Sequence, residues 1–191
     1  MQLAQVNAAR LRYPVDDPRL AGFRAVVDRV NRLADVTPGF VWRDPDAHRE
    51  LHRPAEAGEL LTVVNLSVWE DYASLHRFVY RGPHGQLVRR QREWLLPTSG
   101  PTTALWWVRD GERPTPDAAL ARLAHLKAHG PTPRAFSVKR RFDPDGRPVA
   151  RGGAAGAAGA AGAAGAKTSF AASHAPGASL APPTRRPGAP G

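Results

Sequence analysis

The chain has 191 residues, no cysteine and a formal net charge of +10. This length predicts one compact domain with an extension. The lack of thiols excludes disulfide bonds, thiolate metal sites and a cysteine nucleophile. The most apolar run, residues 60–69, is too short to cross a membrane. The first residues do not show the basic segment followed by a long apolar segment that is typical of a secretory signal, so we expect a cytoplasmic protein.

The positive charge is spread along the chain without a run of like charge. Its densest groups are Arg89, Arg90 and Arg92, and the triplet at 139–141. Binding sites for phosphate chains need clustered Lys and Arg, so the pattern favours a solvated basic surface. We therefore do not expect a nucleic acid as partner, and weak polyanion binding through the basic surface is kept as an alternative.

The first half of the chain predicts three strands and one helix. Residues 2–11 alternate in side-chain character, which is typical of a strand. Asp17 favours a helix start, because apolar residues then follow at spacings of three and four as far as Ala34. Residues 40–43 predict a short strand, and a polar loop follows at 44–58. The Val-rich and Leu-rich stretch 59–69 predicts a central strand.

The second half of the chain mixes helices and strands. A helix is predicted to begin at Glu70 and Asp71 and to end at Gly82 and Pro83, and further helical turns follow at 84–96. Residues 103–109 predict a strand. Thr115 then caps another helix, and residues 135–142 predict a last short strand. This order of elements is that of the split βαβ, or ferredoxin-like, arrangement. The sequence therefore predicts an α+β fold with one antiparallel sheet and its helices on one face.

The face of that sheet opposite the helices is expected to be buried by another part of the protein. It would carry Trp69 and either Trp106 or Trp107, which is too much aromatic surface to leave in water. We expect a second subunit to lie on it, so that two sheets pack face to face. The prediction is a homodimer that forms a dimeric α/β barrel.

The composition changes after Phe142. Residues 143–191 contain 16 Ala, 10 Gly and 7 Pro, and Phe170 is their only aromatic residue. Such a segment buries too little apolar surface to offset the entropy of ordering it. We expect residues 1–142 to form the barrel domain and residues 143–191 to be a disordered tail.

Seven stretches carry a family resemblance. They are 5–11 (QVNAARL), 17–23 (DPRLAGF), 38–43 (PGFVWR), 65–70 (NLSVWE), 78–81 (FVYR), 92–94 (REW) and 105–108 (LWWV). Together they resemble the bacterial domain-of-unknown-function family 3291 over nearly all of residues 1–142. The resemblance implies membership of the dimeric α/β barrel superfamily, which also holds the antibiotic biosynthesis monooxygenases and the Isd-type haem-degrading oxygenases.

The resemblance also implies three candidate catalytic residues. The haem-degrading relatives use an Asn on the first strand, a Trp at the end of the third and a His after the second helix, and Asn7, Trp69 and His84 lie at comparable places. An imidazole can ligate iron, an amide can bond to oxygen and an indole can contact a porphyrin. The plainer alternatives are a core position for Trp69, a paired buried amide for Asn7 and a helix-start position for His84.

A polar pocket is the second expectation. Gln5 and Asn7 share one face of the first strand, and Asn65, Ser67 and Trp69 share one face of the third, its neighbour in a ferredoxin-like sheet. Their reverse sides are apolar, so we expect those to face the helices and the polar rows to face the barrel interior, with His84 at its mouth. The ligand-binding candidates are Gln5, Asn65, Ser67, Trp42 and Trp106. We expect no metal site, because the His pair at 48 and 52 lies in a predicted loop and has no Glu directly after its first His. In the pair at 125 and 129, the second His is near a helix end and more simply interacts with the helix dipole.

Several functions remain open at this stage. The first is a small-molecule-binding barrel that acts as a monooxygenase on an aromatic or polycyclic substrate without a bound cofactor. The alternatives are a non-catalytic ligand-binding or structural dimer, a haem-binding or haem-degrading oxygenase, and the weak polyanion binder. The residues alone do not decide whether the protein is an enzyme.

Overall fold

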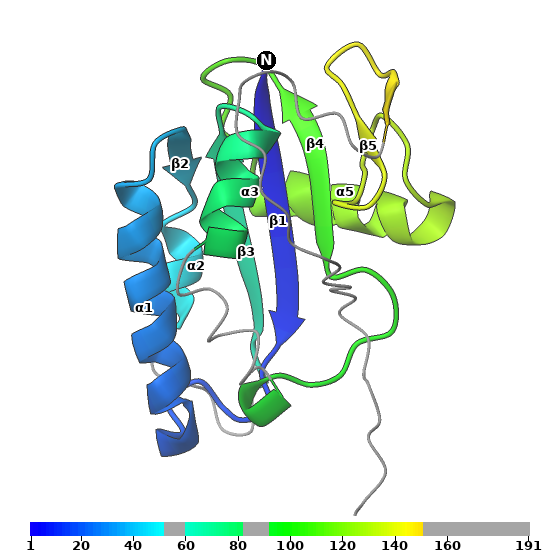
Figure 1. Cartoon of the computed structure of the whole chain (residues 1–191). Coiled ribbons are helices and arrows are strands. Elements are labelled where there is room, and N and C mark those ends of the chain that lie inside the picture. The colour runs from blue at the N-terminus through cyan, green and yellow to red at the C-terminus, as the bar shows by residue number, and fades with distance from the viewer. Residues whose placement is uncertain (52–59, 82–91, 151–191) are drawn as a thin grey trace, which may run out of the picture. The chain divides into compact units, whose positions relative to one another are not determined.

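A computed structural model of the chain describes residues 1–51, 60–81 and 92–150 (Figure 1). Four strands form one antiparallel sheet in the order β2-β3-β1-β4, with bounds β1 (Gln2–Arg10), β2 (Phe40–Arg43), β3 (Thr62–Trp69) and β4 (Thr103–Val108). β1 therefore lies between β3 and β4. This order confirms the predicted ferredoxin-like α+β arrangement.

The helices differ in whether a side chain caps their first turn. The bounds are η1 (Pro18–Leu20), α1 (Ala21–Asp35), α2 (Asp46–Glu50), α3 (Tyr72–Arg81) and α5 (Pro116–His129). The side chain of Thr115 accepts the Ala118 amide at the start of α5, and Gly130 ends that helix with a φ of 70°. α2 lies within the stretch that we expected to be a loop. None of the described helices is long and apolar enough to span a membrane.

Asp17 caps η1 and pairs with Arg19. Its carboxylate accepts the Arg19 amide at 2.8 Å and two guanidinium N–H groups at 2.9 and 2.7 Å. These bonds lower the pKa of Asp17 from 3.8 to about 2, and the side-chain bonds from Arg19 contribute most.

We expect an NMR titration of the Asp17 carboxyl to give this low pKa, and Arg19→Gln to return it towards 3.8. Because the folded pKa lies below the unfolded one, the pair stabilises the fold above pH 4 and this contribution is lost as the pH falls towards 2. An unchanged Asp17 pKa in Arg19→Gln would contradict the assignment of the shift to this pair.

Helices cover both faces of the sheet, not one as predicted. The even-numbered side chains of β1, such as Ala4 and Val6, pack with Leu123 and Leu126 of α5. The odd-numbered Leu3 packs with α3, which lies on the opposite side (Figure 1). We had expected α5 on the same face as the other helices, because its apolar residues indicate that one side is buried but not which face of the sheet that side meets.

The tryptophans that led us to expect a second subunit lie on opposite faces. Trp69 belongs to the α3 side and Trp106 to the α5 side, and both are buried within one chain. Trp107 is on the α3 side, where its indole N–H donates to the Phe142 carbonyl at 2.8 Å. The aromatic residues on which the dimer prediction depended are thus covered within the chain, Trp69 on the α3 side and Trp106 under α5.

The end of the described chain is a hairpin instead of one strand over 135–142. Phe136 exchanges two backbone hydrogen bonds of 2.8 Å with Leu105 of β4, and β5 (Arg141–Phe142) then pairs with β6 (Pro148–Val149). Between them, Asp143 accepts the Arg147 amide and Gly146 has a φ of 82°. The turn sequence Asp-Pro-Asp-Gly indicates this hairpin. Ordered structure therefore extends past Phe142, and the rest of the expected tail, 151–191, lies outside the described residues.

Candidate functional site

The predicted polar rows of β1 and β3 lie side by side. Gln5 is opposite Ser67, and Asn7 is opposite Asn65. These residues share the face of Leu3 and Trp69, which is the face towards α1 and α3. The prediction that the polar rows point away from the helices is therefore wrong. It failed because the apolar reverse side packs on α5.

Most of these polar groups bond with one another. The Ser67 hydroxyl donates to Gln5 Oε1 at 3.0 Å and accepts the Trp69 indole N–H at 3.0 Å. The Asn7 amide donates to Thr103 Oγ1 at 2.9 Å. Pairing of this kind removes the cost of burying a polar group. Gln5, Ser67 and Asn7 are therefore accounted for by structural bonds.

The described residues do not fit a haem. Trp69 is 1% exposed, and its ring lies between those of Phe40 and Phe78, with centroids 5.2 and 4.9 Å away. It has no free face for a porphyrin. His84, the expected axial ligand, lies outside the described residues. Within the described ranges, no three His, Asp or Glu residues come together as a possible metal site.

Two of the five predicted ligand-binding residues lie elsewhere. Trp42 of β2 pairs with Val68 and packs with the core under α5, where Trp106 is also buried. The sheet therefore separates both tryptophans from Gln5, Asn65 and Ser67. A single pocket that includes all five residues does not exist in this fold.

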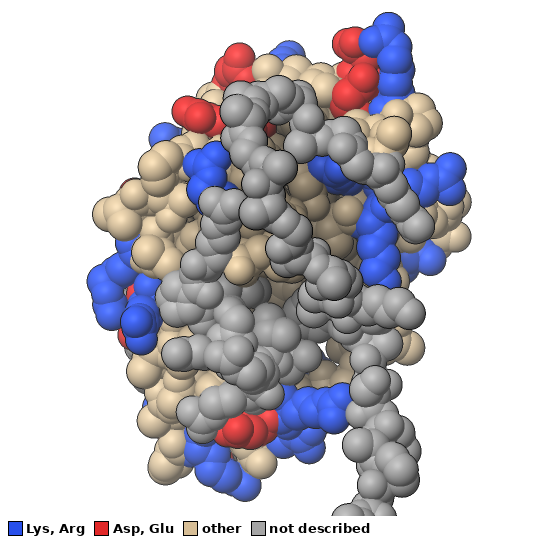
Figure 2. Space-filling view, in the orientation of Figure 1, with Lys and Arg blue, Asp and Glu red and all other residues tan. Residues whose placement is uncertain are grey.

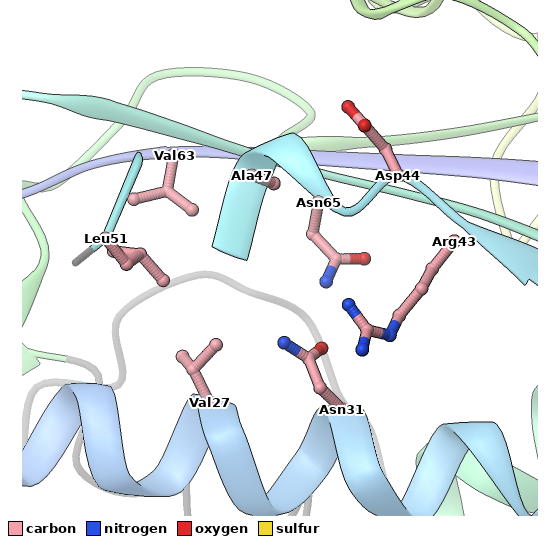
Figure 3. Close-up of a pocket in the computed structure, with 8 residues that line it drawn as sticks. All are labelled: Val27, Asn31, Arg43, Asp44, Ala47, Leu51, Val63 and Asn65. Carbon is pink, nitrogen blue, oxygen red and sulfur yellow. The ribbon is translucent and has the colours of Figure 1, made fainter. Parts of the chain in front are cut away.

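A small cavity does lie between α1 and β3 (Figure 3). Its walls come from α1, the end of β2, α2 and β3, and its lining residues are Val27, Asn31, Arg43, Asp44, Ala47, Leu51, Val63 and Asn65. Its volume is about 20 Å³, which is room for about one water molecule. Of the residues predicted from the sequence, Asn65 alone is among those that line it.

The charged groups at the cavity are already engaged. Arg43 donates to both carboxylate oxygens of Asp35, at 2.9 and 3.2 Å. The Asp44 carboxylate accepts the Asp46 amide at 3.0 Å, at the start of α2. Two amides, those of Asn31 and Asn65, also line the cavity, and Figure 3 shows them pointing towards one another beside the Arg43 guanidinium.

Asn31 was missed in the sequence, although a signal was present. It is buried at 7% exposure on the side of α1 that also carries Val27 and Val30. A polar residue within the apolar stripe of a helix is the pattern that indicates a buried polar site. The sequence could not show that this position meets Asn65, because the two are joined only by the packing of α1 on the sheet.

A second hollow is a surface groove of about 300 Å³ near the start of α1. It is lined by Tyr13, Arg19, Gly22, Glu93 and Trp94. The Arg19 guanidinium lies 3.8 Å above the Tyr13 ring and is held by Asp17. Because Arg19 is already held by Asp17 and Tyr13, we consider the amide cavity the better candidate site.

The fold and this cavity define an α+β protein with a ferredoxin-like sheet and a polar site between the sheet and α1. The chain belongs to the family described as domain of unknown function DUF3291, which matches residues 2–152. No curated protein matches the chain. Among solved structures it is similar to SnoaB, a cofactor-independent oxygenase from Streptomyces nogalater, at 18% identity over 57% of this chain and 94% of that one. The TM-score of 0.39 is too low for an argument about activity.

Proposed function

We propose that the protein binds a small organic molecule at the cavity between α1 and β3. The observation that supports this is the pair of amides, Asn31 and Asn65, that meet among the apolar side chains of Val27, Leu51 and Val63 (Figure 3). Sites for small molecules combine an apolar wall with a few convergent polar groups. An amide offers both a donor and an acceptor, so the pair can hold one carbonyl or hydroxyl group.

The ligand of this proposal is neutral at its anchored end. Arg43 is paired with Asp35, and the Asp44 carboxylate accepts the Asp46 amide, so we expect the two asparagine amides to anchor the ligand. A volume of about 20 Å³ admits one polar group in place of a water molecule. The proposal therefore places only the anchored group of the ligand inside the cavity and the rest of the ligand outside it.

The finer proposal is a monooxygenase that acts on an aromatic or polycyclic substrate without a bound cofactor. A ring ketone held by the amides supplies the electrons itself: one ring methylene becomes a carbonyl, and O₂ provides that oxygen and one water. The protein's part is to bind and orient the ketone and to keep water from its reacting carbon. Binding without turnover would instead support the non-catalytic alternative.

The test compares two asparagines on neighbouring strands. Anthrone, a ketone with three fused rings, should raise the melting temperature of the wild type and of Asn7→Ala, because the Asn7 amide is already bonded to Thr103. Asn65→Ala should weaken binding about tenfold, as expected for the loss of one hydrogen bond to the ligand. Calorimetry measures the affinity, and an oxygen electrode with absorbance of the quinone product measures turnover.

The outcomes separate the sites. If Asn7→Ala loses binding and Asn65→Ala does not, the ligand lies nearer the centre of the sheet and the cavity proposal is wrong. If neither variant changes the affinity, the ketone binds outside both amide positions.

A further inference from the structure

Three aromatic rings form a row along α3. Tyr72, His76 and Tyr80 follow one another at intervals of four residues, with ring centroids 5.6 and 4.4 Å apart. Residues at this spacing lie on one side of a helix. Tyr80 is 51% exposed and His76 is exposed, while Tyr72 is half-buried. The row is therefore a continuous aromatic surface that ends at an exposed tyrosine.

One cation contacts this row, and three others are close in sequence to that cation or to the row. The Arg141 guanidinium, from β5, lies 4.0 Å above the Tyr72 ring, and Arg77 is exposed on α3 itself. Lys139 and Arg140, next to Arg141 in the chain, are exposed as well. In the part of the chain that the structure describes, none of these four cations pairs with a carboxylate. Figure 2 shows Lys and Arg side chains at several places on this face, including the side where Figure 1 places β5 and α5.

The fold creates this surface from segments that are far apart in the sequence. The triplet at 139–141 and the helix at 72–81 are separated by β4 and α5, and the contact of Arg141 with Tyr72 joins them. The sequence alone does not show that these cations and aromatic rings lie together, which is why a nucleic acid was not expected. Stacking of the rings accounts for the aromatic row, but it does not explain why unpaired cations lie beside it.

We propose that this surface binds single-stranded nucleic acid. Exposed aromatic rings stack with bases whatever their sequence, and unpaired Arg and Lys side chains hold the phosphates. A base would stack on the exposed part of Tyr80, and the strand would continue along the row towards Arg141. The net charge of +10 favours approach of such a polyanion. A duplex is a poorer fit, because its bases are already stacked and their faces are not available.

The full-length protein is tested by fluorescence anisotropy with a labelled oligothymidine of about 12 nucleotides. Tyr80→Leu should weaken binding about fivefold or more, whereas Tyr80→Phe, which keeps the ring, should bind like the wild type. Arg141→Gln should weaken binding and reduce its dependence on salt. Arg49→Gln is the matched control, since it removes one exposed cation of α2 that is paired with Asp46.

Circular dichroism and thermal melting establish that each variant is folded, which is expected because Tyr80 and Arg49 are exposed and Arg141 is only partly buried. The proposal is overturned if Tyr80→Leu binds as tightly as Tyr80→Phe, because the ring then plays no part. It is also overturned if a duplex of equal length or inorganic polyphosphate binds as well as the single strand. An equal loss in Arg49→Gln and Arg141→Gln would show that only the overall charge matters.

Discussion

Replacing Trp69 by alanine is expected to lower the free energy of unfolding by about 3 to 5 kcal/mol. The side chain is 1% exposed, and the substitution leaves a cavity between Phe40 and Phe78. It also removes the indole N–H that donates to Ser67 at 3.0 Å. Urea denaturation followed by fluorescence or circular dichroism measures the loss as a lower transition midpoint.

Trp69→Phe separates packing from hydrogen bonding. It keeps much of the ring volume and removes the indole donor, so we expect a loss of about 1 to 2 kcal/mol. Val36→Ala, at a position 75% exposed, should change the stability by less than about 0.5 kcal/mol. If Trp69→Ala were as stable as the wild type but changed its mass in solution, Trp69 would belong to a subunit interface and not to the core.

The second large effect is expected in α5. Leu123→Ala should cost about 2 to 5 kcal/mol of unfolding free energy, because Leu123 is 3% exposed and packs on Ala4 and Val6 of the sheet. Leu120→Ala is the matched control on the same helix. Leu120 is 37% exposed, so its truncation should cost much less. Denaturation curves of the two variants, measured side by side, give the difference.

This pair of variants also tests what covers the sheet. If α5 covers it within the chain, sedimentation gives the same mass for the wild type and for folded Leu123→Ala. A Leu123→Ala protein of unchanged stability would contradict the packing of α5 on the sheet. The homodimer stays a prediction, and it requires a surface other than the sheet face that α5 occupies.

Local patterns in the sequence determined the elements and their order. Alternation over residues 2–11 and the cap at Asp17 depend on neighbours in the chain, so they could be interpreted without a structure. The split βαβ order then limits the sheet to few topologies, and the strand order agrees with it. The pairing of Gln5 and Asn7 with Ser67 and Asn65 follows from that order as well.

Only the tertiary structure decided which face each side chain meets. Both faces of β1 and β3 could pack on helices. In the structure α5 packs on the apolar face, so the polar rows lie on the face towards α1 and α3. The cavity amides Asn31 and Asn65, like the contact of Arg141 with Tyr72, join segments that are far apart in the chain. The sequence determines such contacts only through the free energy of the whole packed core, since no local pattern of charge or hydrophobicity encodes them.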